Sequence, residues 1–288
     1  MITGAATLSR SSARAGATTA DGKYSYRQHT RGREMSDPVP DDKAGSFPHV
    51  VDSCNYQLTV NDFVFLGINE ASAWSCSAKE VPLGIPAAEF PDFVSSLFYE
   101  LDLQGFHDAD VRLQGSSTTF WSNPTKTLPT TRTSRAKLFV EQNHRMPDKA
   151  ELDEIDRRYE STWGHDHPVQ RPFDSLLKLG ISEEASDIDV QISSAAAFAL
   201  ANKAALRLEL SLAEMRVNNP SYDFLITEIS ELEFLYVARW SSRWSDRLGR
   251  QVSVKFFDRG GPPKNEQGIS SHFSPTDWIV TPSKGAGR

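Results

Sequence analysis

The chain has 288 residues, of which 24% are charged and 39% hydrophobic, and its formal net charge is −7. This acidic balance argues against a protein that coats nucleic acid, because phosphate backbones favour clustered Lys and Arg. No apolar run approaches the roughly 20 residues that a membrane-spanning helix needs. The two cysteines, Cys54 and Cys76, are too few for a disulfide framework, so a reduced, cytoplasmic setting is expected.

Residues 1–49 are rich in Ser, Ala, Gly, Thr, Asp and Arg and show no hydrophobic period. Such a segment cannot bury enough apolar surface to offset its chain entropy, so we predict a disordered tail. Its arginines are not followed by the apolar stretch of a secretory signal. An alternative interpretation places the biological start at Met35. A single domain is expected over residues 50–288.

Helical spacing of apolar residues marks the first part of this domain. It predicts a helix over residues 61–79, weakened by the central Gly67, and a stronger helix over residues 86–105. Residues 110–114 then alternate between polar and apolar side chains, which is typical of a strand.

Residues 124–171 are charged, contain no strand-like run and look inserted. One helix is predicted within them, over residues 147–163, with acidic residues at its start. We expect this insertion to form its own helical layer, apart from the core. The chain then returns to apolar residues at Phe173, Leu176, Leu177 and Leu179.

Residues 186–193 alternate strictly between polar and apolar side chains and predict a half-buried strand. Later segments follow the same periodicities. They predict helices over residues 195–212 and 224–248, the second with Leu232 and Leu235 on its apolar side, and strands over residues 252–257 and 278–280.

Two motifs in this pattern carry chemistry. Asp187 and Asp189 lie two residues apart on a strand, so both carboxylates project from one face and can share divalent cations. Gly115 allows a backbone to approach a phosphate closely, and Ser116 and Ser117 supply hydrogen-bond donors. Together they would hold a nucleoside triphosphate with its metal ions.

Leu113-Gln114-Gly115-Ser116 followed by Asp187-Ile188-Asp189-Val190 resembles the signature of the DNA polymerase β-like nucleotidyltransferase superfamily. The resemblance covers roughly residues 87–260. It implies an α+β fold, in which helices flank a small mixed sheet that forms the nucleotidyltransferase core. Here that core would carry the helical insertion at 124–171.

The resemblance also implies roles for individual residues. Asp187 and Asp189 would be catalytic and would hold Mg²⁺ or Mn²⁺, while Gly115 and Ser116 would contact the triphosphate. A third carboxylate is expected on a later strand, and Asp258 is the candidate. Asp258 ends its strand, however, and the mid-strand position is Ser253 or Lys255.

The chain departs from the family in a second way, because the long segment 116–186 separates the two motifs.

Several further residues have both a functional and a structural interpretation. The cations Lys126, Arg132 and Lys178 could steer the triphosphate, although most such residues are surface cations. Trp121 could stack on a base, although it is more simply structural, and His165 and His167 have too few neighbouring ligands for a metal site.

The sequence therefore predicts a magnesium-dependent nucleotidyltransferase that transfers a nucleoside monophosphate from a nucleoside triphosphate to an acceptor hydroxyl and releases pyrophosphate. The acceptor stays open among small molecules, RNA and proteins. Cyclic-oligonucleotide synthesis is disfavoured, because only residues 259–288 follow the third strand. The alternative is a catalytically inactive nucleotide-binding or regulatory protein that retains the fold.

Overall fold

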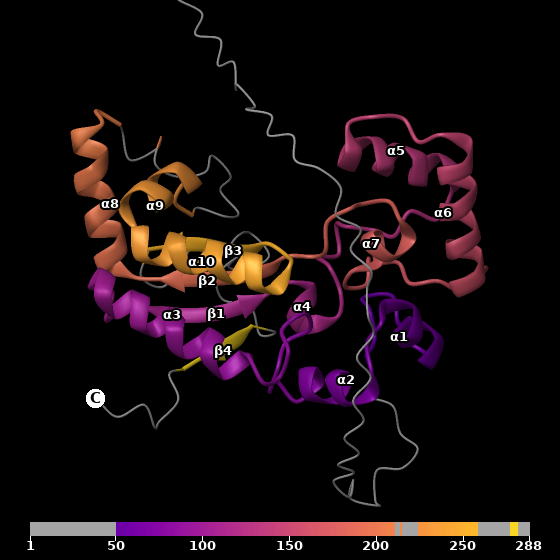
Figure 1. Ribbon diagram of the computed structural model, residues 1–288, viewed down its shortest axis with the longest axis horizontal. Coiled ribbons are helices and arrows are strands. Elements are labelled where there is room, and N and C mark those ends of the chain that lie inside the picture. Colours follow the sequence, from indigo (N-terminus) through magenta and orange to yellow (C-terminus); the bar gives the residue numbers. More distant parts are fainter. Residues whose placement is uncertain (1–49, 211–213, 215–223, 259–276, 282–288) are drawn as a thin grey trace, which may run out of the picture. The chain divides into compact units, whose positions relative to one another are not determined.

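A mixed four-stranded sheet organises the computed structural model (Figure 1). The structure describes residues 50–210, 214, 224–258 and 277–281. The strands are β1 (Asp110–Gln114), β2 (Ile188–Ser193), β3 (Val252–Phe257) and β4 (Trp278–Val280), in the order β3-β2-β1-β4. β1 pairs antiparallel with β2 and β4, whereas β2 and β3 run parallel. Ten helices and this open sheet give the described part of the chain an α+β fold, as predicted.

The alternation that predicted the strands separates an apolar from a polar face. In β2, Ile188, Val190 and Ile192 are fully buried. They share one hydrophobic core with the helices α3 (Phe90–Gln104) and α10 (Leu235–Leu248), which contact each other (Figure 1). The polar residues of the strands lie on the other face, so the core helices leave that face free for polar chemistry.

The contact between α3 and α10 is aromatic. The rings of Trp240 and Trp244 lie against Phe93, with centroids 4.8 and 5.2 Å away. Both indole N–H groups donate to the hydroxyl of Ser96, at 3.0 and 3.1 Å. Buried indoles need such a partner, so one serine hydroxyl satisfies both.

The predicted helix over residues 61–79 is wrong in its continuity, because the structure has two helices there. α1 (Val60–Leu66) ends at Gly67, whose φ of 70° is left-handed, and α2 (Glu70–Ser77) begins after the N-cap Asn69. A left-handed glycine closes a helix, because it turns the chain without the steric cost of a Cβ.

The predicted helix over residues 224–248 is also divided. α9 (Thr227–Glu233) and α10 meet at Phe234, whose φ of −110° and ψ of 55° are not helical. The break shifts the helical phase, so Leu232 and Leu235 are 63% and 50% exposed rather than buried. α10 ends at the left-handed Gly249, where the sequence predicts its end.

Residues 124–171 contain two helices, α5 (Arg132–Asn143) and α6 (Lys149–Thr162). α6 lies within the predicted range and opens with a capping box formed by Asp148 and Glu151. α5 was not predicted, because only Arg135 and Phe139 of its residues are buried and its apolar period is weak.

The two insertion helices have a hydrophobic cluster that is separate from the core at the sheet. Phe139, Ile155, Tyr159 and Trp163 share a hydrophobic cluster with Leu179, at the end of the short helix α7 (Ser175–Leu179), and with Ile181. α6 contacts both α1 and α7 (Figure 1). The insertion therefore packs on the segment that leads into β2.

Two helices remain, α4 (Ser116–Thr119) directly after β1 and α8 (Ala195–Arg207) directly after β2. Among the described residues, no helix is both long and apolar enough to cross a membrane. Residues 1–49, for which a disordered tail is predicted, lie outside the described residues.

Candidate functional site

Asp187 and Asp189 lie at the start of β2 on the polar face of the sheet. Asp187 directly precedes the strand, and Asp189 is its second residue. The register places Asp189 opposite Gln114 of β1 and beside Ser253 of β3. The end of β1 therefore meets the start of β2, and the two sequence motifs come together although residues 116–186 separate them.

Both carboxyl groups of this pair have a raised pKa. Burial, and then repulsion by Asp187, raise the pKa of Asp189 to about 6. Although Asp187 keeps contact with solvent, desolvation raises the pKa of its carboxyl as well. The nearby ammonium groups of Lys126 and Lys255 act in the opposite direction on the pKa of both carboxyls. Two close carboxylates that resist ionisation together indicate a site that a cation would stabilise.

The turn after β1 brings the backbone against Asp189. Gly115 has φ 79°, and a Cβ at this position would collide with the Asp189 carboxylate oxygen. Glycine is required here for both reasons, conformation and space. The turn leads into α4, so residue 116 starts a helical turn beside the carboxylates.

The hydroxyl groups of this turn differ in availability. Ser117 is fully buried and donates to the carbonyl of Gln114 at 3.2 Å, so its side chain does not face a ligand. Thr118 and Thr119 donate to the carbonyl of Gly115 at 3.0 and 3.2 Å. Ser116 has no hydroxyl partner within the described part of the chain. Of the two predicted phosphate contacts, the structure leaves Ser116 available and commits the Ser117 side chain to the backbone.

The candidate third carboxylate, Asp258, is not brought to the pair. It follows the last residue of β3, beside Ser193, whose hydroxyl donates to the Asp258 carbonyl at 2.6 Å. At ~3.3 Å per residue, the backbone of residue 258 lies roughly 16 Å along the strand from Ser253, the neighbour of Asp189. The parallel pairing of β2 and β3 fixes this register, and the mid-strand position next to Asp189 is a serine.

The three cations predicted to steer the triphosphate do not lie together in the structure. Lys178 lies in α7, and its ammonium group would be 3.2 Å from a Cβ at Gly67, so it points toward the end of α1. Arg132 forms ion pairs with Asp153 and Asp156 inside the insertion. Lys126 is the only one of the three predicted cations whose charge acts on the carboxylate pair.

Lys255 of β3 is a site residue that sequence reasoning considered only for the third-carboxylate position. It shares the polar face with Ser253, pairs with Gln191 in the register and has no ion-pair partner among the described residues. Its ammonium group lies 5.0 Å from the centroid of Phe224 and 3.5 Å from the hydroxyl of Thr227. The period-2 pattern of residues 252–257 was the signal that could have placed it there.

Asp277 is a further carboxylate at this sheet, just before β4. It is buried, accepts a 2.6 Å hydrogen bond from the Gln114 amide and lies 3.6 Å from the Arg112 guanidinium. These contacts give the Asp277 carboxylate a structural role.

Within the described ranges, no group of three or more acidic, His or Cys side chains is arranged to hold a metal ion. His165 and His167 accordingly join no such cluster.

Trp121 is buried and lies edge-on to Tyr56, with ring centroids 6.4 Å apart, so its place in the core favours the structural interpretation.

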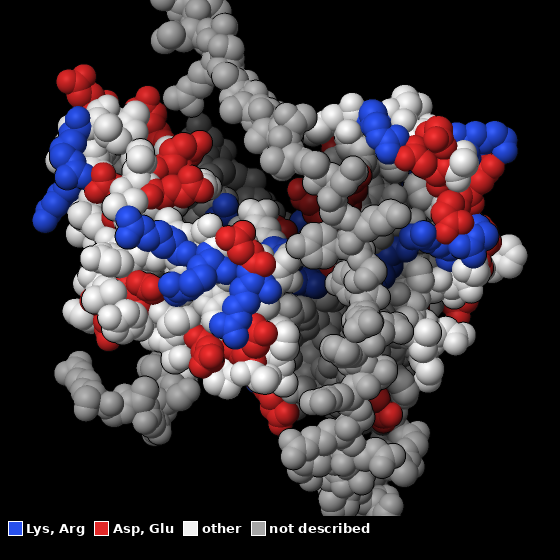
Figure 2. All heavy atoms as spheres, viewed as in Figure 1, with Lys and Arg blue, Asp and Glu red and all other residues white. Residues whose placement is uncertain are grey.

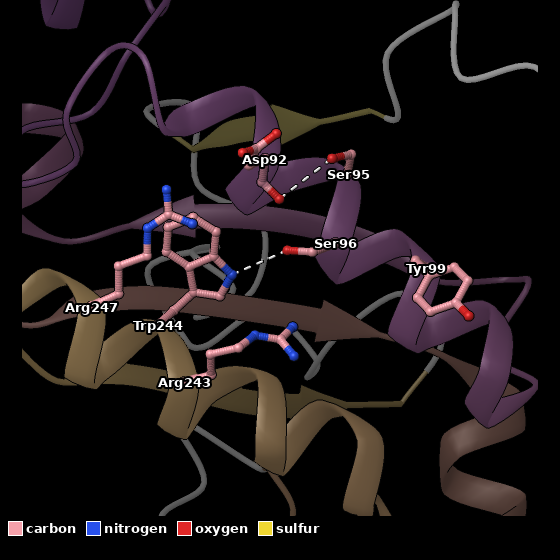
Figure 3. A pocket seen from close by; sticks show the side chains of 7 residues that line it. All are labelled: Asp92, Ser95, Ser96, Tyr99, Arg243, Trp244 and Arg247. Carbon is pink, nitrogen blue, oxygen red and sulfur yellow. Dashed lines mark hydrogen bonds between the residues drawn. The ribbon is translucent and has the colours of Figure 1, made fainter.

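A cavity of about 430 Å³ between α3 and α10 contains none of the predicted site residues (Figure 3). Two arginines line it, Arg243 and Arg247, and they pair with Glu100 and Glu89. On the face in Figure 2, basic and acidic side chains likewise lie side by side over α10.

Comparison with family models, with curated proteins and with solved structures gives no match for this chain. The functional argument therefore depends on its own residues.

Proposed function

We propose that the protein is a nucleotidyltransferase, which transfers a nucleoside monophosphate from a nucleoside triphosphate to an acceptor hydroxyl and releases pyrophosphate. The observation that carries the proposal is the contact of Gly115 with Asp189. It sets a glycine turn with an available serine directly against Asp189, one of two neighbouring carboxyls whose pKa values are raised. A phosphate site and a divalent-cation site would then share one location, as phosphoryl chemistry needs.

The donor set fits magnesium that arrives with the nucleotide. Asp187 and Asp189 supply oxygen ligands, and Mg²⁺ is commonly held by one or two carboxylates, with substrate phosphates and water completing its shell. When bound, the metal would polarise the reacting phosphate and neutralise developing charge. The chain's own residues do the rest. Ser116 would donate to a phosphate oxygen, while Lys126 and Lys255 supply positive charge beside the carboxylates.

A second candidate function has its own support. Ser253 occupies the place beside Asp189, and Asp258 is too far along β3 to help activate an acceptor. These two observations favour a nucleotide-binding protein that does not catalyse transfer. The two candidates share the nucleotide site and differ only in chemistry.

The test compares wild type with the double variant Asp187→Asn/Asp189→Asn. Magnesium together with the preferred nucleoside triphosphate is expected to raise the melting temperature of wild type and not of the variant, because amides are poor magnesium ligands. Equal stabilisation of both proteins would exclude the carboxylates as the metal site. Stabilisation of wild type with no pyrophosphate released in the presence of a cell extract would support the second candidate.

A further inference from the structure

Lys255 places an accessible ammonium group at the β3 edge of the sheet. β3 is the outer strand in the order β3-β2-β1-β4 (Figure 1). The contacts of this ammonium group are the Thr227 hydroxyl and the ring of Phe224, which are both neutral, and it forms no ion pair within the part of the chain that the structure describes. A ligand that covers this group removes water from a charge, so it is favoured when it brings an anion.

The β3 side of the carboxylate pair carries one charge. Ser253 lies beside Asp189 in the parallel register, and Lys255 follows on the same polar face, roughly 7 Å further along the strand. Lys255 is the one charged side chain within β3. A group of the substrate that lies beside Ser253 therefore meets a neutral hydroxyl first and the ammonium of Lys255 next.

The two sides of the carboxylate pair carry different groups. β2, which carries Asp189, lies between β1 and β3. On the β1 side the turn at Gly115 and Ser116 approaches Asp189, and on the β3 side lie Ser253 and Lys255. Ligands on both sides of the carboxylates would thus meet the turn at one end and the Lys255 ammonium at the other.

The geometry of phosphoryl transfer assigns these two sides. The attacking and the leaving oxygen lie roughly in line, on opposite sides of the reacting phosphorus. When the turn at Ser116 holds the leaving pyrophosphate, the attacking hydroxyl approaches from the β3 side. Lys126 suits the triphosphate, because it follows this turn in the chain and lowers the pKa of both carboxyls more than Lys255 does.

We propose that Lys255 binds the acceptor, and that the acceptor is a small molecule that carries an anionic group, a carboxylate or a phosphate, in addition to its reacting hydroxyl. The inference rests on the proposed function. Of the three cations that act on Asp187, Arg250 is paired with Asp174, which leaves Lys126 and Lys255. Two cations are too few for the repeated phosphates of a nucleic acid, so a small acceptor is favoured.

In the reaction, the acceptor oxygen forms a bond to the α-phosphorus. The bond from that phosphorus to its bridging oxygen breaks, and the bridging oxygen leaves with the electron pair as part of pyrophosphate. The hydroxyl proton passes to solvent, and the anionic group of the acceptor stays unchanged beside Lys255. No oxidant, reductant or further reactant is needed.

The experiment sorts the acceptors of a cell extract by size and charge. Ultrafiltration separates small molecules from macromolecules, and an anion-exchange resin at neutral pH then divides the ultrafiltrate into retained anions and a flow-through. Each fraction is incubated with wild type, magnesium and α-³²P-labelled nucleoside triphosphates in excess over those of the extract. Treatment of the retained fraction with a phosphatase, which is removed before labelling, distinguishes a phosphate from a carboxylate on the acceptor.

Four variants test whether Lys255 holds the acceptor. Lys255→Met removes the charge and keeps a long side chain, whereas Lys255→Arg keeps the charge. Lys126→Met removes the charge assigned to the triphosphate, and Lys203→Met is the control at an exposed lysine of α8. For each protein we measure the concentration of the retained fraction that gives half-maximal labelling, together with the rise in melting temperature that magnesium and nucleotide cause.

We expect wild type to label a molecule of the retained fraction. Lys255→Met should need at least about tenfold more of that fraction for half-maximal labelling, the loss expected for one charged hydrogen bond, while nucleotide still stabilises it as it does wild type. Lys255→Arg should recover most of the loss, and Lys203→Met should behave as wild type. Lys126→Met should instead weaken the stabilisation by nucleotide.

Three outcomes would overturn the inference and leave the proposed function standing. They are label in the flow-through, label only in macromolecules, and an unchanged half-maximal concentration for Lys255→Met. Loss of nucleotide stabilisation in Lys255→Met would place the triphosphate at Lys255 and overturn the inference as well. If wild type labels no fraction, the proposed transfer itself fails, and the acceptor assignment falls with it.

Discussion

At the residue scale, the site depends on the absence of a side chain at one position. Gly115 and Gly105 both have a positive φ, of 79° and 83°, but their ψ angles of −168° and 19° place only Gly105 in the left-handed helical region. They differ in surroundings, because a Cβ at residue 105 would meet nothing within 4 Å, whereas at residue 115 it would meet the Asp189 carboxylate. The chain therefore offers two glycines to compare: Gly105 is left-handed and has open space around it, whereas Gly115 has a conformation that essentially only glycine adopts and also contacts a carboxylate.

Gly105→Ala is expected to lower the free energy of unfolding by about 1 kcal/mol, the cost of a left-handed alanine. Gly115→Ala should cost more, and it should also abolish magnesium-dependent nucleotide stabilisation because the carboxylate must move. Chemical denaturation and thermal-shift measurements check both expectations. A Gly115→Ala protein that matches Gly105→Ala in stability and still binds nucleotide would contradict the contact described here.

At the element scale, one buried carboxylate connects α1 with the end of α6. Asp62 accepts hydrogen bonds from the backbone N–H of Thr59 at 2.6 Å, from its hydroxyl at 2.7 Å and from the Trp163 indole N–H at 2.5 Å. The Tyr56 hydroxyl donates to it as well, at 3.1 Å. This one side chain completes the capping box of α1 and holds the insertion against it.

Asp62→Ala is expected to destabilise the protein by about 3 kcal/mol, because several buried donors lose their charged acceptor together. Asp92→Ala is the matched control, since Asp92 is also in the first turn of a helix but is exposed. Urea denaturation of both variants measures the difference. Equal, small losses of about 0.5 kcal/mol would mean that α1 and the insertion are held by their apolar contacts alone.

Alternation and capping patterns in the sequence predicted the strands and helix ends that depend only on neighbouring residues. The strands at residues 110–114, 252–257 and 278–280 and the helix boundaries at Gly105 and Gly249 follow from alternation and capping. The register between β2 and β3 depends on contacts between residues far apart in sequence, so the distance of Asp258 from the carboxylate pair was not predictable. The period-2 pattern could place Lys255 on the polar face with Ser253, but its position beside the carboxylates depends on the same register.

At the scale of the whole molecule, two kinds of carboxyl oppose each other in the pH dependence of stability. Burial would raise the pKa of Asp52, but N–H donors from Tyr56, Cys54 and two residues near 170 lower it below the usual 3.8. A lowered pKa stabilises the folded state above the unfolded pKa, and this contribution is lost as pH falls through the folded pKa. The raised pKa of Asp189 acts in the opposite direction. Its contribution is complete below the unfolded pKa of about 4 and is lost as pH rises through about 6.

The metal-free protein should therefore be most stable between the pH at which the Asp52 contribution is lost and the pH at which the Asp189 contribution is lost. With chelator present, we expect the free energy of unfolding to fall by about 2 kcal/mol between about pH 4.5 and about pH 7.5 on account of Asp189. Asp189→Asn should remove this fall, whereas the control Asp166→Asn, at an exposed position, should leave it unchanged.

Added magnesium should restore stability to wild type at the higher pH and not to Asp189→Asn, because a cation relieves the repulsion between the two carboxylates. Urea denaturation across this pH range measures all five cases. If Asp189→Asn retains the wild-type slope, the pair is not the group that makes the folded protein sensitive to neutral pH, and magnesium has no electrostatic reason to bind there.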